Sequence, residues 1–520
     1  MSSRKAIGID LGTTFSAVAH IDNYGKPQII PNAESERITP SVVLFDGSNV
    51  IVGTQAKNSA VSEPERIVDF IKREMGKSKE QFHREFNGRI YSAEELSALI
   101  IKKLKLDAEK YLGQLVTDVV ITVPAYFNDA ERTATITAGQ LAGLNVLQII
   151  NEPTAAALAY GLDKLDEDQT VFVFDLGGGT FDVTIMRIQN HKIEMLATNG
   201  DHRLGGKDWD DVIVNRVAEE FEKLHGEMPL LDLHSYQDLH NRAVAAKIQL
   251  SSRGRSLVVH HHGGKSVKVE FTRKQFEKDT RHLVEKCKTI CEMVMQEAKI
   301  KWKEIDKVLL VGGMTRMPMI REMISKLSSV ELSDHVNPDE VVALGASIQA
   351  VLSLLNEESI AGEKFVDENT RRQFSGLDGG LIQITDITSH TLGVILWDER
   401  HLHEYVFPMI RKMTSIPAVA RNSFGTANSN MQRAVVKVVE GESSLPAECT
   451  PLGVCDVQLP PFLPKGSPVE LTYEYNANQV LEVSVIAAGN RSKVSINRNT
   501  GLAPTEIQQA TSGLQELNVS

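Results

Sequence analysis

Residues 171–185 limit what this chain can fold into more than any other segment does. They contain an apolar strand, three consecutive glycines, and a second strand with alternating apolar residues. Because glycine has no Cβ, backbone N–H groups in such a bend can approach a ligand closely. Asp175 precedes the glycines and Asp182 follows them, so two carboxylates lie at the same tip. Amide donors beside carboxylates suit a metal–phosphate complex, with magnesium held through its waters.

Residues 6–18 repeat this pattern. A strand is followed by Asp10-Leu11-Gly12, by two threonines, and by a second strand. One isolated Asp-x-Gly segment is most often a plain turn. Two copies indicate a duplicated domain whose halves hold one polyphosphate between them, because self-similarity within a chain reflects a repeated architecture.

Length, charge and cysteine content narrow the class of protein. The 520 residues exceed what one hydrophobic core normally supports, so we expect several domains. The net charge is −12, from 68 acidic and 56 basic residues, and a nucleic-acid partner is disfavoured because no basic cluster stands out. Four cysteines do not make a disulfide framework. No signal-like segment precedes the first strand and no run has the length of a membrane span, so we expect a cytoplasmic protein without a membrane partner.

Two further residues of the first half are candidates for the same site. Glu152 follows an apolar strand, which is where ligand-facing residues lie in α/β sheets. It also begins an alanine-rich helix, where the helix dipole explains an acid equally well. Lys72 lies in a stretch that we predict to be helical from about Glu65, and an ordinary solvated lysine is the alternative there.

Four long segments make the pattern specific: IDLGTT at 9–14, TVPAYFND at 122–129, INEPTAAA at 150–157 and FDLGGGTFD at 174–182. In sequence and in order they resemble the signatures of the heat shock protein 70 family, the DnaK-type molecular chaperones. The resemblance extends to about residue 507. It implies an α/β actin-like ATPase with duplicated ribonuclease-H-like lobes, followed by an all-β sandwich. The implied domains are the ATPase domain at 1–357, a polar stretch and interdomain linker at 358–387, a peptide-binding sandwich at 388–502 and a short helical remnant of a lid at 503–520.

The resemblance also implies roles for the hairpin residues. Asp10 and Asp175 would hold magnesium through waters, with Glu152 in the outer shell. Lys72 would lie against the terminal phosphate and the attacking water, and Asp182 would order that water. Such a set is chemically sufficient, because phosphoryl transfer needs positioning and charge neutralisation more than covalent help. The implied catalytic residues are Lys72, Glu152, Thr180 and Asp182, and the implied phosphate cradle is Gly12, Thr13, Thr14, Gly177, Gly178, Gly179 and Thr180.

The second half of the ATPase domain carries the implied contacts to the rest of the nucleotide. Gly205 and Gly206 open a predicted helix, and a helix N-terminus suits a phosphate. Gly312-Gly313 alone is equally well a tight turn. Val244 departs from the family, since relatives often carry a ribose-binding glutamate there. By resemblance the nucleotide contacts are Gly205, Gly206, Lys247 and Ser251 for adenosine, Gly312, Gly313, Arg316 stacked on adenine, and Asp339 near the base.

Pro124 and Arg132 resemble the family's switch pair, which relays the nucleotide state towards the sandwich. Asp386 ends the implied interdomain linker. In relatives this linker is a continuous apolar run before the aspartate, whereas here Gln383 and Thr385 interrupt it. The resulting alternation suits an edge strand that docks on the ATPase domain, and we expect weaker coupling between the domains.

Residues 388–500 read as short strands between turns, the pattern of a β-sandwich. The resemblance implies a cleft that binds extended peptide, although each of its residues alone is more often ordinary core. Trp397 would narrow this groove. The last residues allow one short helix, so we expect no helical lid and rapid release of bound peptide. The implied cleft residues are Val394, Leu396, Trp397, Phe424, Ala427, Ala434 and Val436.

Together these features predict an ATP-dependent molecular chaperone that hydrolyses ATP and couples nucleotide state to the binding and release of extended hydrophobic segments. The implied cofactors are ATP or ADP and magnesium. The implied partners are unfolded polypeptides, a J-domain co-chaperone and a nucleotide-exchange factor. Two alternatives stay open at this point: a nucleotide-gated binding module with little turnover, and a small-molecule kinase of the actin-like superfamily, which would need a carboxylate base and would not need the sandwich.

Overall fold

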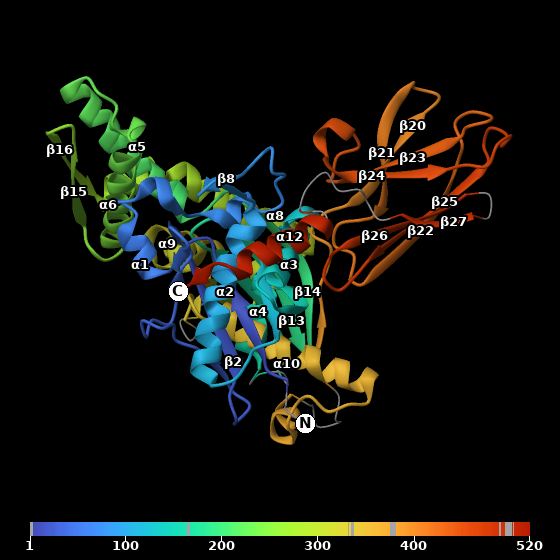
Figure 1. The fold of residues 1–520 in the computed structure, drawn as a ribbon, viewed down its shortest axis with the longest axis horizontal. Helices are drawn as coiled ribbons and strands as arrows, with labels where there is room; N and C mark the ends of the chain where they lie inside the picture. The colour runs from blue at the N-terminus through green and yellow to red at the C-terminus, as the bar shows by residue number, and fades with distance from the viewer. Residues whose placement is uncertain are drawn as a thin grey trace.

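The computed structural model describes residues 4–487 other than 163, 165, 166, 331, 334–336 and 375–380, and then residues 490–494, 502 and 504–520. Two α/β lobes pack against each other, and a β-sandwich lies beside them (Figure 1). We name the lobes by their central hairpins. Lobe I is built on β1 and β2, and lobe II is built on β12 and β13.

The two lobes contain sheets with the same strand order. In lobe I, β1 pairs with β2 antiparallel on one side and with β10 parallel on the other; in lobe II, β12 pairs with β13 and β17 in the same way. A third antiparallel strand and a second parallel strand extend each sheet. The repeated hairpin of the sequence therefore belongs to a repeated sheet. The strands are β1 (Ala6–Asp10), β2 (Phe15–Ile21), β3 (Pro27–Ile29), β10 (Asp118–Val123) and β11 (Asn145–Asn151) in lobe I, and β12 (Gln169–Leu176), β13 (Phe181–Gln189), β14 (Lys192–Asp201), β17 (Lys307–Val311) and β18 (Leu332–Ser333) in lobe II.

Two helices form the layer between the sheets. α10 (Val341–Ala361) packs against β1 and β2 and against α4 (Glu152–Gly161). Glycine allows this close approach, since a Cβ on Gly345 would lie 2.8 Å from the Cα of Ala155. Of the helices in the described ranges, α10 is the one with the length and apolarity of a membrane span, and most of it is buried inside the protein.

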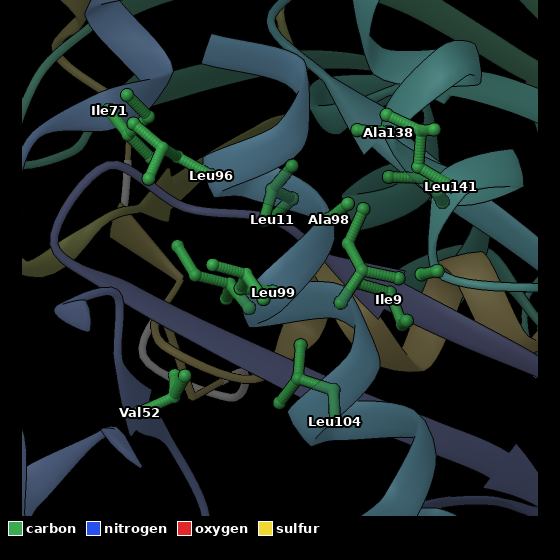
Figure 2. Packing of buried hydrophobic residues seen from close by; sticks show 14 of the residues in the cluster. Ile9, Leu11, Val52, Ile71, Leu96, Ala98, Leu99, Leu104, Ala138 and Leu141 are labelled. Carbon is green, nitrogen blue, oxygen red and sulfur yellow. The ribbon is translucent and has the colours of Figure 1, made fainter. Parts of the chain in front are cut away.

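The outer face of the lobe I sheet is covered by α2 (Ala93–Leu112) and α3 (Asp129–Leu141). Both helices begin with a capping box, in which the side chains of Ser92 and Asn128 accept hydrogen bonds from the backbone three residues on. These caps fix where the two helices begin. Figure 2 shows the core beneath the helices, which includes Ile9, Leu11, Leu96, Ala98, Leu99, Leu104, Ala138 and Leu141.

The stretch predicted to be helical from Glu65 is not a helix. It consists of two short 3₁₀ turns, Pro64–Arg66 and Ile71–Glu74, with the short strand β7 (Ile67–Val68) between them. Phe70 has a φ of 53°, a left-handed conformation that an α-helix does not admit. The remaining short elements of lobe I are β4 (Thr39–Pro40), β5 (Val43–Asp46), β6 (Asn49–Val52), α1 (Thr54–Ser59), β8 (Arg84–Phe86) and β9 (Arg89–Tyr91).

Lobe II carries its own helices and a projecting extension. α8 covers β13 and β14, while α5, α6 and the hairpin β15–β16 pack on one another to form the extension drawn in green in Figure 1. The bounds of these elements are α5 (Gly206–His225), α6 (Leu233–Ser252), β15 (Arg255–His262), β16 (Lys265–Thr272), α7 (Arg273–Asp279), α8 (Arg281–Ala298) and α9 (Pro318–Ser328).

The sandwich consists of two four-stranded antiparallel sheets around one core, as the alternating pattern predicts. One sheet has the order β21-β20-β23-β24 and the other β22-β25-β26-β27. The strands are β20 (Leu392–Asp398), β21 (His403–Ile410), β22 (Ala418–Gly425), β23 (Arg433–Glu440), β24 (Thr450–Gln458), β25 (Pro468–Tyr475), β26 (Leu481–Ala487) and β27 (Asn490–Val494).

The connection between the two lobes and the sandwich is largely folded. The predicted boundary at residue 357 falls inside α10, and α11 (Glu368–Gln373) leads to Phe374, which is fully buried in the core between the lobes. The interrupted apolar run forms β19 (Gln383–Thr385), which adds in parallel to the edge of β14. Gln383 and Thr385 therefore do not prevent the linker from docking as an edge strand.

The last residues pack on lobe I. α12 (Pro504–Gln515) lies against α2 and α3 (Figure 1), and β28 (Asn518–Val519) pairs in parallel with β6. Lys102 of α2 donates to the carbonyl oxygens of Leu514 and Leu517 at 2.9 and 3.1 Å, which satisfies the end of α12. Three residues of the segment join the lobe I core: Ala510, Leu514 and Val519.

Leu514→Ala is expected to weaken the attachment of this segment by about 2 kcal/mol or more, because it removes a side chain that is 2% exposed and leaves a cavity. Hydrogen–deuterium exchange of β6 measures the effect, since the amide of Val52 donates to Ser520 only when the segment is attached. Leu115→Ala, at a side chain 78% exposed, is the matched control and should leave the exchange unchanged. Equal exchange in the two variants would contradict the assignment of Leu514 to the core.

Candidate nucleotide site between the lobes

The tips of the two central hairpins face each other between the lobes. A Cβ added to Gly178 would lie 2.5 Å from the hydroxyl oxygen of Thr14, and one added to Gly179 would lie 2.7 Å from the Cβ of Thr13. Real Cβ atoms essentially never come so close to another atom. The structure therefore brings together the two predicted phosphate-binding loops, and glycine is what permits it.

The start of α5 rests on the same tip. A Cβ on Gly205 would lie 2.5 Å from the backbone nitrogen of Gly179, and the amide of Gly206 donates to the carbonyl of Gly177 at 2.9 Å. The loop containing Gly205 and Gly206 is thus held against the lobe II hairpin, as the sequence predicts. A helix N-terminus in this position favours negative charge, such as that of a phosphate.

Several backbone groups of the hairpins are already used and others are free. The amide of Gly12 donates to Ser16 Oγ at 3.2 Å, and the carbonyl of Thr180 accepts from Gly177 at 3.1 Å. In the ranges that the structure describes, the amides of Gly178 and Gly179 meet no acceptor. Two unpaired N–H groups at a glycine tip are what a phosphate oxygen requires.

A third loop adjoins the lobe II hairpin from β17. Gly312 has a φ of 82°, and a Cβ there would lie 2.8 Å from Oδ1 of Asp175. Arg316 donates to Asp339 through Nη1 at 2.6 Å, and both side chains are partly exposed. Gly313 lies beside the same aspartate. The predicted nucleotide contacts from this part of the chain therefore lie together at one edge of the site.

Lys247 and Ser251 lie one turn apart on α6, as predicted. The ammonium of Lys247 donates to the carbonyl of Gly206 at 2.8 Å and to Asp210 at 2.7 Å. Burial raises the pKa of Asp210 to about 6, against the opposing effect of Lys247. This ion pair holds Lys247 at the start of α5, beside the phosphate-binding loops, while Ser251 lies farther along α6.

Four carboxyl groups and one ammonium gather beneath the hairpins. Asp175 and Asp182 are cross-strand partners on β12 and β13. Lys72 forms a buried ion pair with Glu152, and the hydroxyl of Thr122 donates to Asp10 at 3.1 Å. All four of the predicted acidic residues and the predicted lysine are therefore in one buried cluster, although they come from different parts of the chain.

The electrostatics of this cluster favour an added cation. Burial, followed by the carboxylate of Glu152, raises the pKa of Asp10 to about 7 and that of Asp182 to about 8. The same two causes raise the pKa of Asp175 well above its ordinary value. Burial lowers the pKa of Lys72, but the neighbouring carboxylates of Glu152 and Asp10 outweigh it and leave the pKa raised. Four acids share one base, so the cluster lacks positive charge.

A magnesium–nucleotide complex fits these residues. The carboxylates supply hard oxygen ligands, and the free amides of the glycine tip supply donors to phosphate. Within the described ranges, no three His, Cys, Asp or Glu side chains are arranged to hold a metal ion by themselves. Water and phosphate oxygens would therefore complete the coordination of a magnesium ion near Asp10 and Asp175.

Comparison with known families agrees with this geometry. A family model described as Hsp70 protein matches residues 6–519. The chain belongs to the Hsp70 family. Members of this family are ATP-dependent molecular chaperones, so the resemblance seen in the sequence is confirmed over essentially the whole chain.

In this Hsp70 protein the predicted switch residues lie where the sandwich meets lobe I. Arg132 is fully buried and donates to the carbonyls of Ala125 and Phe127, each at 2.9 Å. The hydroxyl of Ser389, from the sandwich side, donates to the same carbonyl of Ala125. Pro124, which follows the last residue of β10, directly precedes this shared acceptor.

The linker aspartate is held in the same region. The hydroxyl of Thr154, on α4, donates to Asp386 Oδ1 at 2.8 Å, and the carbonyl of Asp386 accepts from the amide of Ile416. Burial raises the pKa of Asp386. Because α4 begins at Glu152, one short helix joins the acidic cluster to the linker.

The predicted peptide-binding residues divide into two groups. Val394 and Val436 are buried in the sandwich core, with 1% and 6% of their surface exposed. Leu396, Phe424 and Ala434 are half-buried at the edge of that core, where the rings of Phe424 and Phe407 meet at 5.3 Å.

Trp397 and Ala427 do not join these residues. Successive residues of a strand point to opposite faces, so Trp397 lies on the other face of β20 from Leu396, and it is 52% exposed. Ala427 is exposed in the loop after β22. A tryptophan on that face does not narrow a groove lined by Leu396.

Arg73 is a functional candidate that the sequence did not reveal. Its Nε and Nη2 donate to the carbonyl of Gly179 at 3.0 and 2.8 Å, and Nη2 also reaches Asp208 at 2.7 Å. Arg73 therefore joins lobe I to the hairpin and to α5 of lobe II. The feature of the sequence that could have indicated Arg73 is its position directly after Lys72.

Gly179→Ala is expected to destabilise the protein by about 1–3 kcal/mol, because the new Cβ would collide with the Cβ of Thr13. Gly177→Ala is the matched control. A Cβ at Gly177 would meet only the carbonyl of Thr180 at 3.8 Å, so its unfolding temperature should stay near that of the wild type. Differential scanning calorimetry without nucleotide compares the variants, and equal destabilisation would mean that the hairpins are not in contact.

Proposed function

We propose that this Hsp70 protein hydrolyses ATP between its lobes and couples the nucleotide state to the binding and release of extended apolar segments of unfolded polypeptides. The observation that supports hydrolysis most directly is the buried Lys72–Glu152 pair beside Asp10, Asp175 and Asp182 at the hairpin tips. The repeated strand order supports the finer interpretation of the lobes as duplicated ribonuclease-H-like halves of an actin-like ATPase. The family match favours neither the kinase nor a binding module with little turnover.

Each residue of the cluster has a role that its position supports. Glu152 orients the ammonium of Lys72 towards the space between the hairpins, where it would offset the charge of the terminal phosphate. Asp182, whose Oδ1 accepts from the amide of Tyr126 at 3.0 Å, is fixed in place to order the attacking water. Magnesium, when bound, would neutralise phosphate charge from the side of Asp10 and Asp175.

The proposed coupling follows the contacts between the domains. Two strands of lobe I, β10 and β11, end at Val123 and Asn151. The residues just after these ends carry the carbonyl of Ala125, which accepts from Ser389, and the hydroxyl of Thr154, which donates to Asp386. A change in the approach of the lobes would therefore alter the surface on which the sandwich and linker dock. A J-domain protein and a nucleotide-exchange factor are the partners that this cycle implies, and a cytoplasmic location stays a prediction.

Lys72→Ala should reduce ATP turnover by about 100-fold or more while ADP affinity changes little, because the ammonium acts on charge that develops during transfer. Single-turnover hydrolysis and calorimetric titration with ADP give the two quantities. Lys103→Ala is the matched control, since Lys103 is also buried and paired with an acid, Asp107, but lies on α2. Normal turnover in Lys72→Ala would remove the catalytic role, and loss of ADP binding would indicate a structural one.

Coupling is tested by the dissociation of a fluorescent Leu-rich peptide with and without ATP. ATP should accelerate release from the wild type and fail to do so in Thr180→Ala, because Thr180 closes the lobe II hairpin. Thr137→Ala, at a buried threonine on α3, should behave as the wild type. Peptide that binds but ignores ATP in the wild type would contradict coupling, and absence of peptide binding would contradict the chaperone function itself.

A further inference from the structure

Two acids meet where the sandwich docks on lobe I. Glu440, at the end of β23, accepts a hydrogen bond from the amide of Asp129, the first residue of α3, at 3.4 Å. Asp129 is completely buried and Glu440 is 4% exposed. The carboxylate of Asp129 in turn accepts from the amide of Leu481 on β26 at 2.9 Å. Both carboxyl groups are therefore removed from water by docking and lie next to each other.

In the described part of the chain, no basic side chain forms an ion pair with the carboxyl group of Glu440. Arg132 is a neighbouring cation, but its Nε and Nη2 donate to the carbonyls of Ala125 and Phe127 and to the amide oxygen of Asn151. A buried, unpaired carboxyl group next to a second one is far more stable when it carries a proton. In agreement, burial and then the charge of Asp129 raise the pKa of Glu440 to about 8.

Other titratable groups at this domain contact do not account for a change of protonation between pH 5 and 8. Burial lowers the pKa of His390 to about 4 and raises the pKa of Tyr475 and Tyr126, so these three stay neutral between pH 5 and 8. Glu442 is engaged by the amide and hydroxyl of Thr391. The charged and titratable groups that face Glu440 or its neighbours are Asp129, Glu131 and Arg132 of α3, Tyr126 and His202 of the ATPase domain, and His390, Glu442 and Tyr475 of the sandwich.

We propose that the Asp129–Glu440 contact makes docking of the sandwich on lobe I depend on protons: the domains dock with Glu440 protonated and separate more readily once Glu440 ionises. Docking then takes up one proton, because the free sandwich exposes the same side chain to water. The consequence for peptide release rests on the proposed function, whereas the docking equilibrium does not.

The direction of the pH effect follows from linkage. An acid whose pKa is higher in the docked state than in the free state stabilises docking, and the contribution is complete below the free-state pKa of about 4.3. This contribution is lost as the pH rises from the free-state pKa to the docked-state pKa. Between about pH 5 and the docked value near 8, the docking constant should fall by up to about tenfold per pH unit. Acidification therefore favours the docked arrangement.

Hydrogen–deuterium exchange measures docking directly and independently of hydrolysis. The amides of Leu481 and Gln383 donate across the domain contacts, to Asp129 and to His191, so their protection reports separation of the domains. After correction for the intrinsic pH dependence of exchange, protection at both amides should fall about five- to tenfold between pH 6.5 and 7.5. Val483, which lies in the β25–β26 ladder inside the sandwich, serves as the internal control and should not change.

Glu440→Gln is the decisive variant, because glutamine resembles the protonated side chain. In this variant the corrected protection of Leu481 and Gln383 should be independent of pH. Glu470→Gln, at an exposed acid on β25, is the matched control and should respond as the wild type does. Asp129→Asn keeps the acceptor for Leu481 but removes the neighbouring negative charge, which lowers the proton affinity of Glu440 in the docked state. Its response should therefore end at a lower pH than that of the wild type, with a weaker slope above pH 6.5. The same pH dependence in the wild type and in Glu440→Gln, or none in the wild type, would overturn the proposal.

Discussion

The contact between two glycine turns and two threonines is the constraint on which the site depends. Gly178 and Gly179 lie so close to Thr14 and Thr13 that no side chain could stand at either glycine without moving the lobes apart. This approach places the amides of lobe II opposite the hydroxyls of lobe I, with the acidic cluster beneath them. Arg73 then secures the arrangement from lobe I by binding the carbonyl of Gly179. The geometry of the nucleotide site is thus a property of the interface between lobes and not of either lobe alone.

The contact between lobe I and the sandwich lies at the residues that follow β10. The carbonyl of Ala125 accepts from Arg132 within lobe I and from Ser389 of the sandwich, so one backbone atom joins the buried arginine to the docking surface. Asp386 is bound by Thr154 on α4, the helix that Glu152 begins. Few residues separate the acidic cluster from the linker, and this short connection is what the proposed coupling relies on.

The sequence predicted local features well and long-range partners poorly. The hairpins and the strands of the sandwich follow from short patterns of glycine and of alternating apolar residues. The family resemblance pointed to Lys72 and Glu152. The helical stretch around Lys72 was wrong, because the left-handed Phe70 depends on tertiary packing. Trp397 lies on the opposite face of β20 from Leu396, because successive residues of a strand alternate between its two faces. The Asp129–Glu440 contact joins residues 311 positions apart, and no local pattern reports such a pair.

The position of β28 has a consequence for how this chain is made. Most of lobe I precedes lobe II and the sandwich along the chain, and domains generally fold in the order of their synthesis. The edge of β6 and the groove between α2 and α3 nevertheless stay uncovered until α12 and β28 emerge, since these elements supply Leu514 and Val519 to the lobe I core. An open strand edge beside exposed apolar side chains is a site for association with other chains. Lobe I therefore emerges before lobe II and the sandwich, but its core is completed only after both.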